Sequence, residues 1–393
     1  MKRWLLLVMV LFMVLMPIQR AKGEDAPEDE NWDAVFMQVL SGLDFSKMEE
    51  ALNNMGDETK ALLGGSVRQG VALAGKGELR LDAWQIIQTI YSLTMESIRE
   101  NGGMLLRILL LSAISALVGV LKPSLHAKGA AEAASMVSYL IILTMLCQVL
   151  YSAVSTARDA VSSMSGVISA VFPVMLVLLT AMGGSMSGAV FSPAMAVLTS
   201  GIGVFIQTTV LPMVLTSGVL VLISSISERV QISKMAAFIK KIAVWTISVI
   251  FVVFLAVTTL QGLSGAAMDG VTLRTTKFAI DKFVPIIGGM FSDTVDTLLG
   301  CSLVIKNGIG IVGTVLMAVS ILTPVLSIAS LGLMLSFAAA IVEPFGEKRI
   351  HKCLGDVSGV MTLLYVTILA LGAMMFILLT LTVASGNINM MLR

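Results

Sequence analysis

Charged side chains are scarce in this chain of 393 residues. They make up 13% of it, and 56% of the residues are apolar, whereas a soluble domain typically carries about 25% charge. The 26 Lys and Arg nearly balance the 25 Asp and Glu, so the chain lacks the excess of basic residues typical of a nucleic-acid binder. The high hydrophobicity excludes a disordered chain. The composition predicts an all-α polytopic membrane protein.

Residues that carry catalysis or hold metals are also few. The three cysteines, Cys147, Cys301 and Cys353, lie far apart, and the only histidines are His126 and His351. A disulfide framework or a zinc site needs closely spaced thiols or Cys/His clusters. We find no nucleophile elbow and no acid/base pair on one helix face. We therefore expect no enzymatic activity, no cofactor and no metal site.

One glycine motif comes close to a phosphate-binding loop. Gly70 to Lys76 has the spacing G-x-x-x-x-G-K, but Gly77 stands where Ser or Thr would hold magnesium. No strand pattern precedes the motif. We interpret it as a glycine-rich turn.

The first 23 residues have the features of a secretory signal. A basic start, Met1-Lys2-Arg3, precedes the apolar run 4–16. This run forms about 20 Å of helix, which is short of the roughly 30 Å of a hydrocarbon core. We expect a signal peptide over residues 1–23, with an uncleaved anchor as the alternative. Both place the following segment outside the cytoplasm.

Residues 24–103 form an acidic segment with helical periodicity. They hold fifteen acids against six bases, a net charge of −9. Trp32, Phe36 and Leu40 lie on one helical face together with Val35 and Val39. Further helices are expected to begin at residue 46 and near residue 82, the last ending at the glycines 102–103. The segment predicts a small helical extracytoplasmic domain.

Residues 104–393 form the expected multi-span membrane domain. Apolar runs of spanning length cover 104–121, 134–154, 242–260 and 360–383. The tracts 166–226 and 301–342 are too long for one simple helix each and contain glycines and prolines. We expect them to hold extra spans, or re-entrant and broken helices. Arg107, inside the first run, either extends its charge to the outer surface or lines a polar cavity.

Basic residues gather in three loops, which sets the expected orientation. They are Lys122 and Lys128; Arg229, Lys234, Lys240 and Lys241; and Lys348, Arg349 and Lys352. Placing all three loops in the cytoplasm satisfies the positive-inside rule and leaves the acidic domain outside. This arrangement requires an even number of spans, six or eight, and an external C-terminus.

A spacing of 112 residues recurs along the membrane domain. It separates Pro212 from Pro324 and Lys240 from Lys352. Repeated units build many membrane transporters. The spacing favours an internal duplication, with coincidence as the alternative.

The external segment 261–310 carries the candidate partner or pathway residues. They are Asp269, Arg274, Lys277, Asp281, Asp293 and Asp296. Two interpretations stay open for this segment. One is an amphipathic helix on the membrane surface, and the other is a re-entrant element whose polar residues line a pathway or bind an external partner.

The same segment carries a family resemblance. Asp269-Gly-Val-Thr-Leu-Arg-Thr-Thr-Lys-Phe, Phe283-Val-Pro-Ile-Ile-Gly and Met290-Phe-Ser-Asp-Thr-Val-Asp-Thr resemble stage III sporulation protein AE of endospore-forming bacteria. The order of signal, acidic domain and glycine-rich spans agrees over essentially the whole chain.

The resemblance implies a place in the mother-cell membrane around the forespore. The protein would belong to a transenvelope channel complex with a secretion-type ATPase, ring-forming proteins and a forespore membrane partner, needed for late forespore gene expression and spore development. It would act there as a pore-forming or platform subunit. An autonomous secondary transporter and a non-conducting scaffold for the rings are the alternatives, and the lipid bilayer is a partner in each case.

Overall fold

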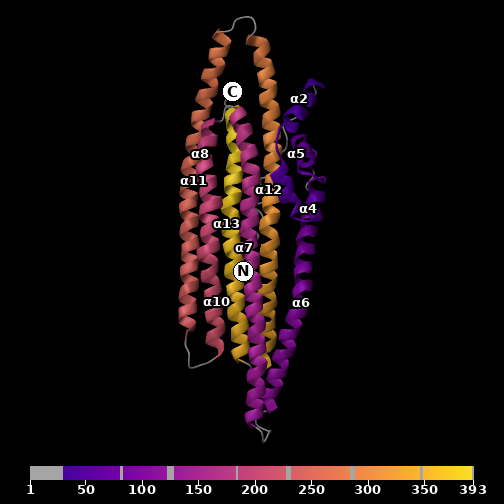
Figure 1. Ribbon diagram of the computed structural model, residues 1–393, viewed down its shortest axis with the longest axis vertical. Coiled ribbons are helices and arrows are strands. Elements are labelled where there is room, and N and C mark those ends of the chain that lie inside the picture. Colours follow the sequence, from indigo (N-terminus) through magenta and orange to yellow (C-terminus); the bar gives the residue numbers. More distant parts are fainter. Residues whose placement is uncertain are drawn as a thin grey trace.

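The protein is a bundle of long helices with a small helical head (Figure 1). The computed structural model describes residues 30–79, 83–121, 128–182, 185–226, 232–283, 288–345 and 348–391, and for 261–296 it describes the backbone alone. Within these ranges the chain is helical and has no strand. The expected signal peptide, and the residues Lys122 and Arg229, lie outside the described residues.

Four short helices form the head. They are α2 (Glu30–Ser41), α3 (Ser46–Asn53), α4 (Asp57–Leu62) and α5 (Val67–Gly75). Trp32, Phe36 and Leu40 are buried, as the periodicity of α2 predicts. The expected helix start at residue 46 is confirmed.

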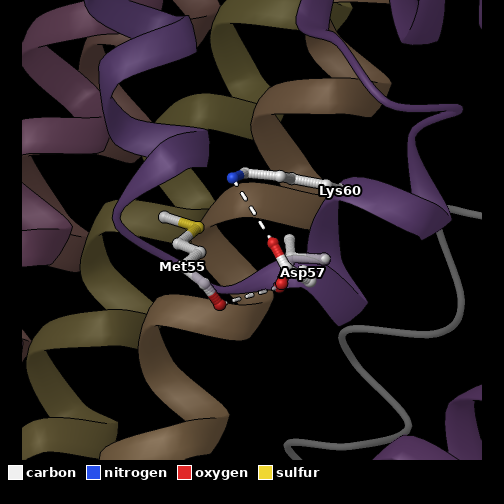
Figure 2. A network of polar contacts seen from close by, with 4 residues as sticks. Met55, Asp57 and Lys60 are labelled. Carbon is white, nitrogen blue, oxygen red and sulfur yellow. Dashed lines mark hydrogen bonds and ion pairs between the residues drawn. The ribbon is translucent and has the colours of Figure 1, made fainter.

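Polar contacts join the short helices of the head. The α5 N-terminus is closed by Glu49, whose Oε1 accepts from the Val67 amide at 2.7 Å. Before α3, the Ser46 amide donates to the exposed Asp44 carboxylate, and this bond lowers the pKa of Asp44. Figure 2 shows the start of α4, where Lys60 Nζ lies 3.5 Å from Asp57 Oδ1 and Thr59 Oγ1 donates to the Met55 carbonyl. Such an exposed ion pair adds little stability.

Within the described residues, six passes run along the bundle. Five are single helices: α6 (Ala83–Leu121), α7 (Lys128–Ala181), α11 (Ser233–Phe283), α12 (Gly288–Val342) and α13 (Lys348–Met391). The other consists of α8 (Ser185–Ala196), η1 (Val197–Ile202), α9 (Gly203–Phe205), η2 (Ile206–Val210) and α10 (Leu211–Ile226). A short 3-10 turn, η3 (Glu343–Phe345), follows α12.

Five of these passes contain a stretch that is apolar enough to cross a membrane, and the longest helices exceed its thickness. The described residues contain five helical stretches of suitable length and composition, namely 136–181, 203–225, 233–260, 297–342 and 349–384. Helix α7 has 54 residues, about 80 Å at 1.5 Å per residue, against roughly 30 Å of hydrocarbon. The bundle therefore extends beyond a bilayer. With α6, which contains the expected run 104–121, a count of six spans stays a prediction.

In the two long tracts, the expectation of re-entrant or broken helices was wrong for residues 301–342, whereas the descending pass within 166–226 is interrupted by the π-helical turns η1 and η2. Residues 301–342 lie within the single helix α12, which continues through Pro324. Residues 166–226 hold the end of α7 and one descending pass. Proline removes one backbone bond, and the π-helical turn η2 directly before Pro212 accommodates that loss. Where no water can replace backbone hydrogen bonds, a helix that keeps the remaining ones is favoured.

The expected helix end at the glycines 102–103 was also wrong. Helix α6 runs through both of them, and a Cβ added to either would meet no atom within 4 Å. The cost of a glycine inside a helix is about 1 kcal/mol, which the continuing backbone bonds of α6 outweigh. The domain boundary predicted at residue 103 stays untested, because one helix joins the two sides.

The ends of the helices sort into two groups. Figure 1 shows the C-terminal ends of α6, α10 and α12 at the same end of the bundle as the N-terminal ends of α7, α11 and α13. We call this the basic end, since Lys128, Lys234 and Lys348 lie in the first turns of these three ascending helices. The head helices lie beside the opposite half of the bundle.

The 112-residue spacing relates two helical hairpins of the same form. Pro212 and Pro324 both lie on descending helices, α10 and α12, while Lys240 and Lys352 both lie near the start of the ascending helices that follow. Matching proline and lysine positions in two equivalent hairpins support the predicted duplication.

Helix α12 contacts α6, α7 and α13 in the bundle. Small residues allow these helices to approach closely: a Cβ on Gly372 would lie 2.6 Å from Ile321 Cγ1, and one on Gly310 would lie 2.6 Å from Val383 Cγ2. Serine pairs, such as Ser336 with Ser358 at 2.7 Å, bond α12 to its neighbours. Small residues and hydroxyl pairs are the usual contacts between helices in lipid.

Candidate functional site

The six candidate residues of segment 261–310 lie on a helical hairpin. Asp269, Arg274, Lys277 and Asp281 are on the last part of α11, and Asp293 and Asp296 are near the start of α12. Neither expected interpretation, a separate surface helix or a re-entrant element, describes this backbone, because α11 and α12 continue through the segment. We call residues 261–283 of α11 and 288–296 of α12 the two arms. Figure 1 shows that they extend past the other helices at the end opposite the basic end.

The arms are long enough to reach another protein. From Leu260, the last residue of the apolar run 242–260, to Phe283, the end of α11, the helix rises by about 35 Å. The sequence placed these residues on the correct end of the bundle but did not show that they belong to two extended helices. Helix length beyond a membrane has no hydropathy signal, which explains the omission.

Glycines allow the head helix α5 to pack closely against α12 of the bundle. A Cβ on Gly308 of α12 would lie 2.6 Å from the carbonyl oxygen of Val71 and 3.4 Å from the Gly75 amide, both on α5. A Cβ on Gly75 would meet Val304 of α12 at 3.1 Å. The two backbones therefore lie against each other, which only glycine permits. This α5–α12 contact sets the position of the head.

The same contact corrects the interpretation of the G-x-x-x-x-G-K motif. Residues 67–75 form helix α5 rather than a turn. Gly70 faces α12 through Val312, whose Cγ2 would lie 3.3 Å from an added Cβ. The glycines serve helix packing, and no phosphate-binding loop is formed there.

A buried cation, Lys306, lies beside this contact and was not among the residues predicted from the sequence. Its side chain is 0% exposed, and its Nζ donates to the Val383 carbonyl of α13 at 2.6 Å. The next residue, Asn307, has a buried Oδ1 without a hydrogen-bond partner among the described residues. A single lysine inside a stretch otherwise free of charge from 297 to 342 is the signal that could have identified this site.

Two other polar residues lie at the bundle surface or near it. Arg107 on α6 is exposed, so the helices of this chain do not enclose it in a cavity, and its extension to the membrane surface stays a prediction. His351 lies on α13 and is half-buried, with Nδ1 3.0 Å from the Ala339 carbonyl. Within the described residues no group of His, Cys, Asp and Glu could hold a metal ion.

The fold and these surfaces define an all-α polytopic membrane protein whose polar extensions, the head and the α11–α12 arms, lie away from its basic end. The model of the family "Stage III sporulation protein AE" matches residues 66–386. The chain belongs to this family, and hence to the sporulation membrane proteins.

A curated relative supports the same family. The stage III sporulation protein AE of Bacillus subtilis (strain 168) is 28% identical over 395 residues, which cover 100% of this chain and 99% of the relative. No solved structure matches the chain.

The expected orientation can be measured with enzyme fusions. Alkaline phosphatase fused after residue 60 should be active, because the enzyme folds only outside the cytoplasm, and fusions near residues 235 and 350 should be inactive. Immunoblots of the three fusions control for expression. The reverse pattern would place the basic end outside and overturn the topology.

Proposed function

We propose that this protein is a membrane subunit of the channel complex that joins the mother cell to the forespore and supports late forespore gene expression. In this role it is a platform in the mother-cell membrane. Its head and its α11–α12 arms lie in the space between the two membranes and contact the ring-forming proteins. Its basic end faces the cytoplasm and the secretion-type ATPase.

One observation carries the platform role. Two helices, α11 and α12, extend beyond the apolar runs 242–260 and 301–342 as arms that carry charged residues at the end opposite the basic end (Figure 1). A transporter that works alone has no need of such arms, whereas a subunit that must reach partners across a space does. Membership of the sporulation family supports the same role.

The packing of the bundle favours a platform over a pore through one chain. Helix α12 contacts α6, α7 and α13, and glycine contacts such as Gly372 with Ile321 close the space between helices. A pore, if this protein lines one, therefore forms between copies or between this chain and its partners.

A second candidate is an autonomous secondary transporter. Two observations favour it: the pair of equivalent hairpins and the buried cation Lys306. Purified protein reconstituted alone in vesicles should transport substrate if this candidate is correct, and should not if the protein is a platform.

The test of the proposed function is a clean deletion in the spore-forming host, scored with a reporter of late forespore transcription after engulfment. We expect arrest at that stage and rescue by the intact gene. A gene carrying Arg274→Glu and Lys277→Glu should fail to rescue, because reversed charges on the α11 arm repel the partner surface that the native charges attract.

Immunoblots must show the double variant at the level of the native protein. Normal late transcription in the deletion strain would reject the proposed function. Full rescue by the double variant would reject only the role of the α11 arm in binding a partner.

A further inference from the structure

A polar cavity of about 290 Å³ opens near the basic end, between α10, α11 and α13. Its polar lining consists of Ser217, Ser224, Ser233, Lys240, Lys352 and Asp356. Both lysines were expected in separate basic loops, and in the structure they line one cavity. They occupy equivalent positions near the starts of α11 and α13.

Packing holds Lys240 in place. Its Nζ donates to the Gly359 carbonyl on α13 at 2.7 Å, and a Cβ on Gly359 would lie 3.0 Å from the same nitrogen. Glycine at 359 thus leaves the space that the ammonium group occupies. Of the three donors that an ammonium carries, the Gly359 carbonyl accepts from one.

The charges around the cavity favour an anion. Two lysines line it against a single carboxylate, that of Asp356. Ser233, also in the lining, is the first residue of α11, so the positive end of the α11 dipole adds to the same field. Hydroxyl groups and ammonium groups together are suitable donors for the oxygens of a phosphate.

The position of the cavity indicates where the phosphate comes from. Lys240 lies directly before the apolar run 242–260, and Asp356 lies shortly before the run 360–383, so the cavity is at the depth where lipid headgroups begin. Basic pockets between membrane helices at this depth bind anionic lipid headgroups.

We infer that this cavity binds the phosphate group of an anionic phospholipid through Lys240 and Lys352. The bound headgroup joins α11 to α13 and so links the two related hairpins at the membrane surface. Asp356 limits the affinity, since its carboxylate faces the same space.

Native mass spectrometry of the full-length protein in detergent tests this inference. The protein is titrated with phosphatidylglycerol and, separately, with phosphatidylcholine, whose choline cancels the phosphate charge. We expect preferential retention of phosphatidylglycerol. The double variant Lys240→Gln/Lys352→Gln should weaken the binding of phosphatidylglycerol about 30-fold, because each lysine near the membrane surface contributes about 1 kcal/mol to such binding.

The matched control is Lys234→Gln/Lys241→Gln, which removes the same charge from exposed positions of the basic end outside the lining. We expect less than about a threefold loss, because screening weakens charges at a distance. Equal losses in the two double variants would show attraction to general surface charge and overturn the inference.

Two further variants separate binding from folding. Lys352 is exposed, so Lys352→Gln should leave the melting temperature unchanged while weakening retention roughly fivefold. Asp356→Asn should strengthen retention a few-fold, an outcome that a purely structural role of the cavity does not produce. Unchanged retention in both variants would overturn the inference.

A competition experiment identifies the source of the phosphate. If excess inorganic phosphate displaces phosphatidylglycerol from the native protein, but has no effect on the Lys240→Gln/Lys352→Gln variant, free phosphate also occupies the site. If it displaces none, the site requires the lipid. Both results support a phosphate site, and no preference for phosphatidylglycerol over phosphatidylcholine in the native protein would reject it.

Discussion

Replacing Lys306 by glutamate should prevent the protein from accumulating in a folded form. The side chain is 0% exposed, and its Nζ donates to the Val383 carbonyl at 2.6 Å. A carboxylate there would point one acceptor at another and would leave a buried negative charge without the donor it needs. Such a charge costs several kcal/mol, a large part of the roughly 5–15 kcal/mol that stabilises a typical folded protein.

The matched variant for this prediction is Lys306→Met. Methionine keeps an unbranched chain of similar length and removes the charge, so the lost hydrogen bond is offset by the avoided desolvation. We expect its melting temperature in detergent, followed by tryptophan fluorescence, to lie within a few degrees of the native value. A Lys306→Glu protein that accumulated and melted like the native one would show that this contact does not support the fold.

The sequence predicted those features of the fold that depend on hydrophobicity and charge. The apolar runs became long helices, and the basic positions Lys128, Lys234 and Lys348 gathered at one end of the bundle, as the positive-inside rule requires. The face of α2 with Trp32 and Phe36 is buried. Each of these results follows from the periodic or local placement of residues.

Features that depend on tertiary contact were not predictable in the same way. Glycines at 70, 102 and 103 suggested turns, yet α5 and α6 continue through them. Gly70 has no side chain because another helix packs closely against it, and a single sequence does not show which helix that is. Likewise, Lys306 is one basic residue in the sequence, and only the neighbouring carbonyl of Val383 shows that it links α12 to α13.

In the candidate site, too, the sequence predicted which residues are charged but not how the helices that carry them are arranged. The charged positions Arg274 and Lys277 were identified from their pattern, but the form of the segment that carries them, two arms continuing α11 and α12, was not. The cavity between Lys240 and Lys352 combines both cases. Their spacing of 112 residues was visible, and the packing of two hairpins was needed to bring them to one place.

Replacing Gly308 by valine should release the head from the bundle. A Cβ at this position would lie 2.6 Å from the Val71 carbonyl oxygen, which belongs to the backbone of α5 and cannot move aside alone. Overpacking of this kind typically costs about 1–3 kcal/mol. Amide hydrogen exchange in α5 should therefore accelerate roughly 10- to 100-fold, since a tenfold change corresponds to about 1.4 kcal/mol.

The control for the release of the head is Gly300→Val, eight residues earlier on the same helix, where an added Cβ meets no atom within 4 Å. Both variants place the same β-branched residue inside α12, so their effects on helix propensity are equal. Faster exchange in α5 must then come from the α5–α12 contact. Equal exchange rates in the two variants would show that the head is held by other contacts, such as those of α2 with α12 and of α3 with α7.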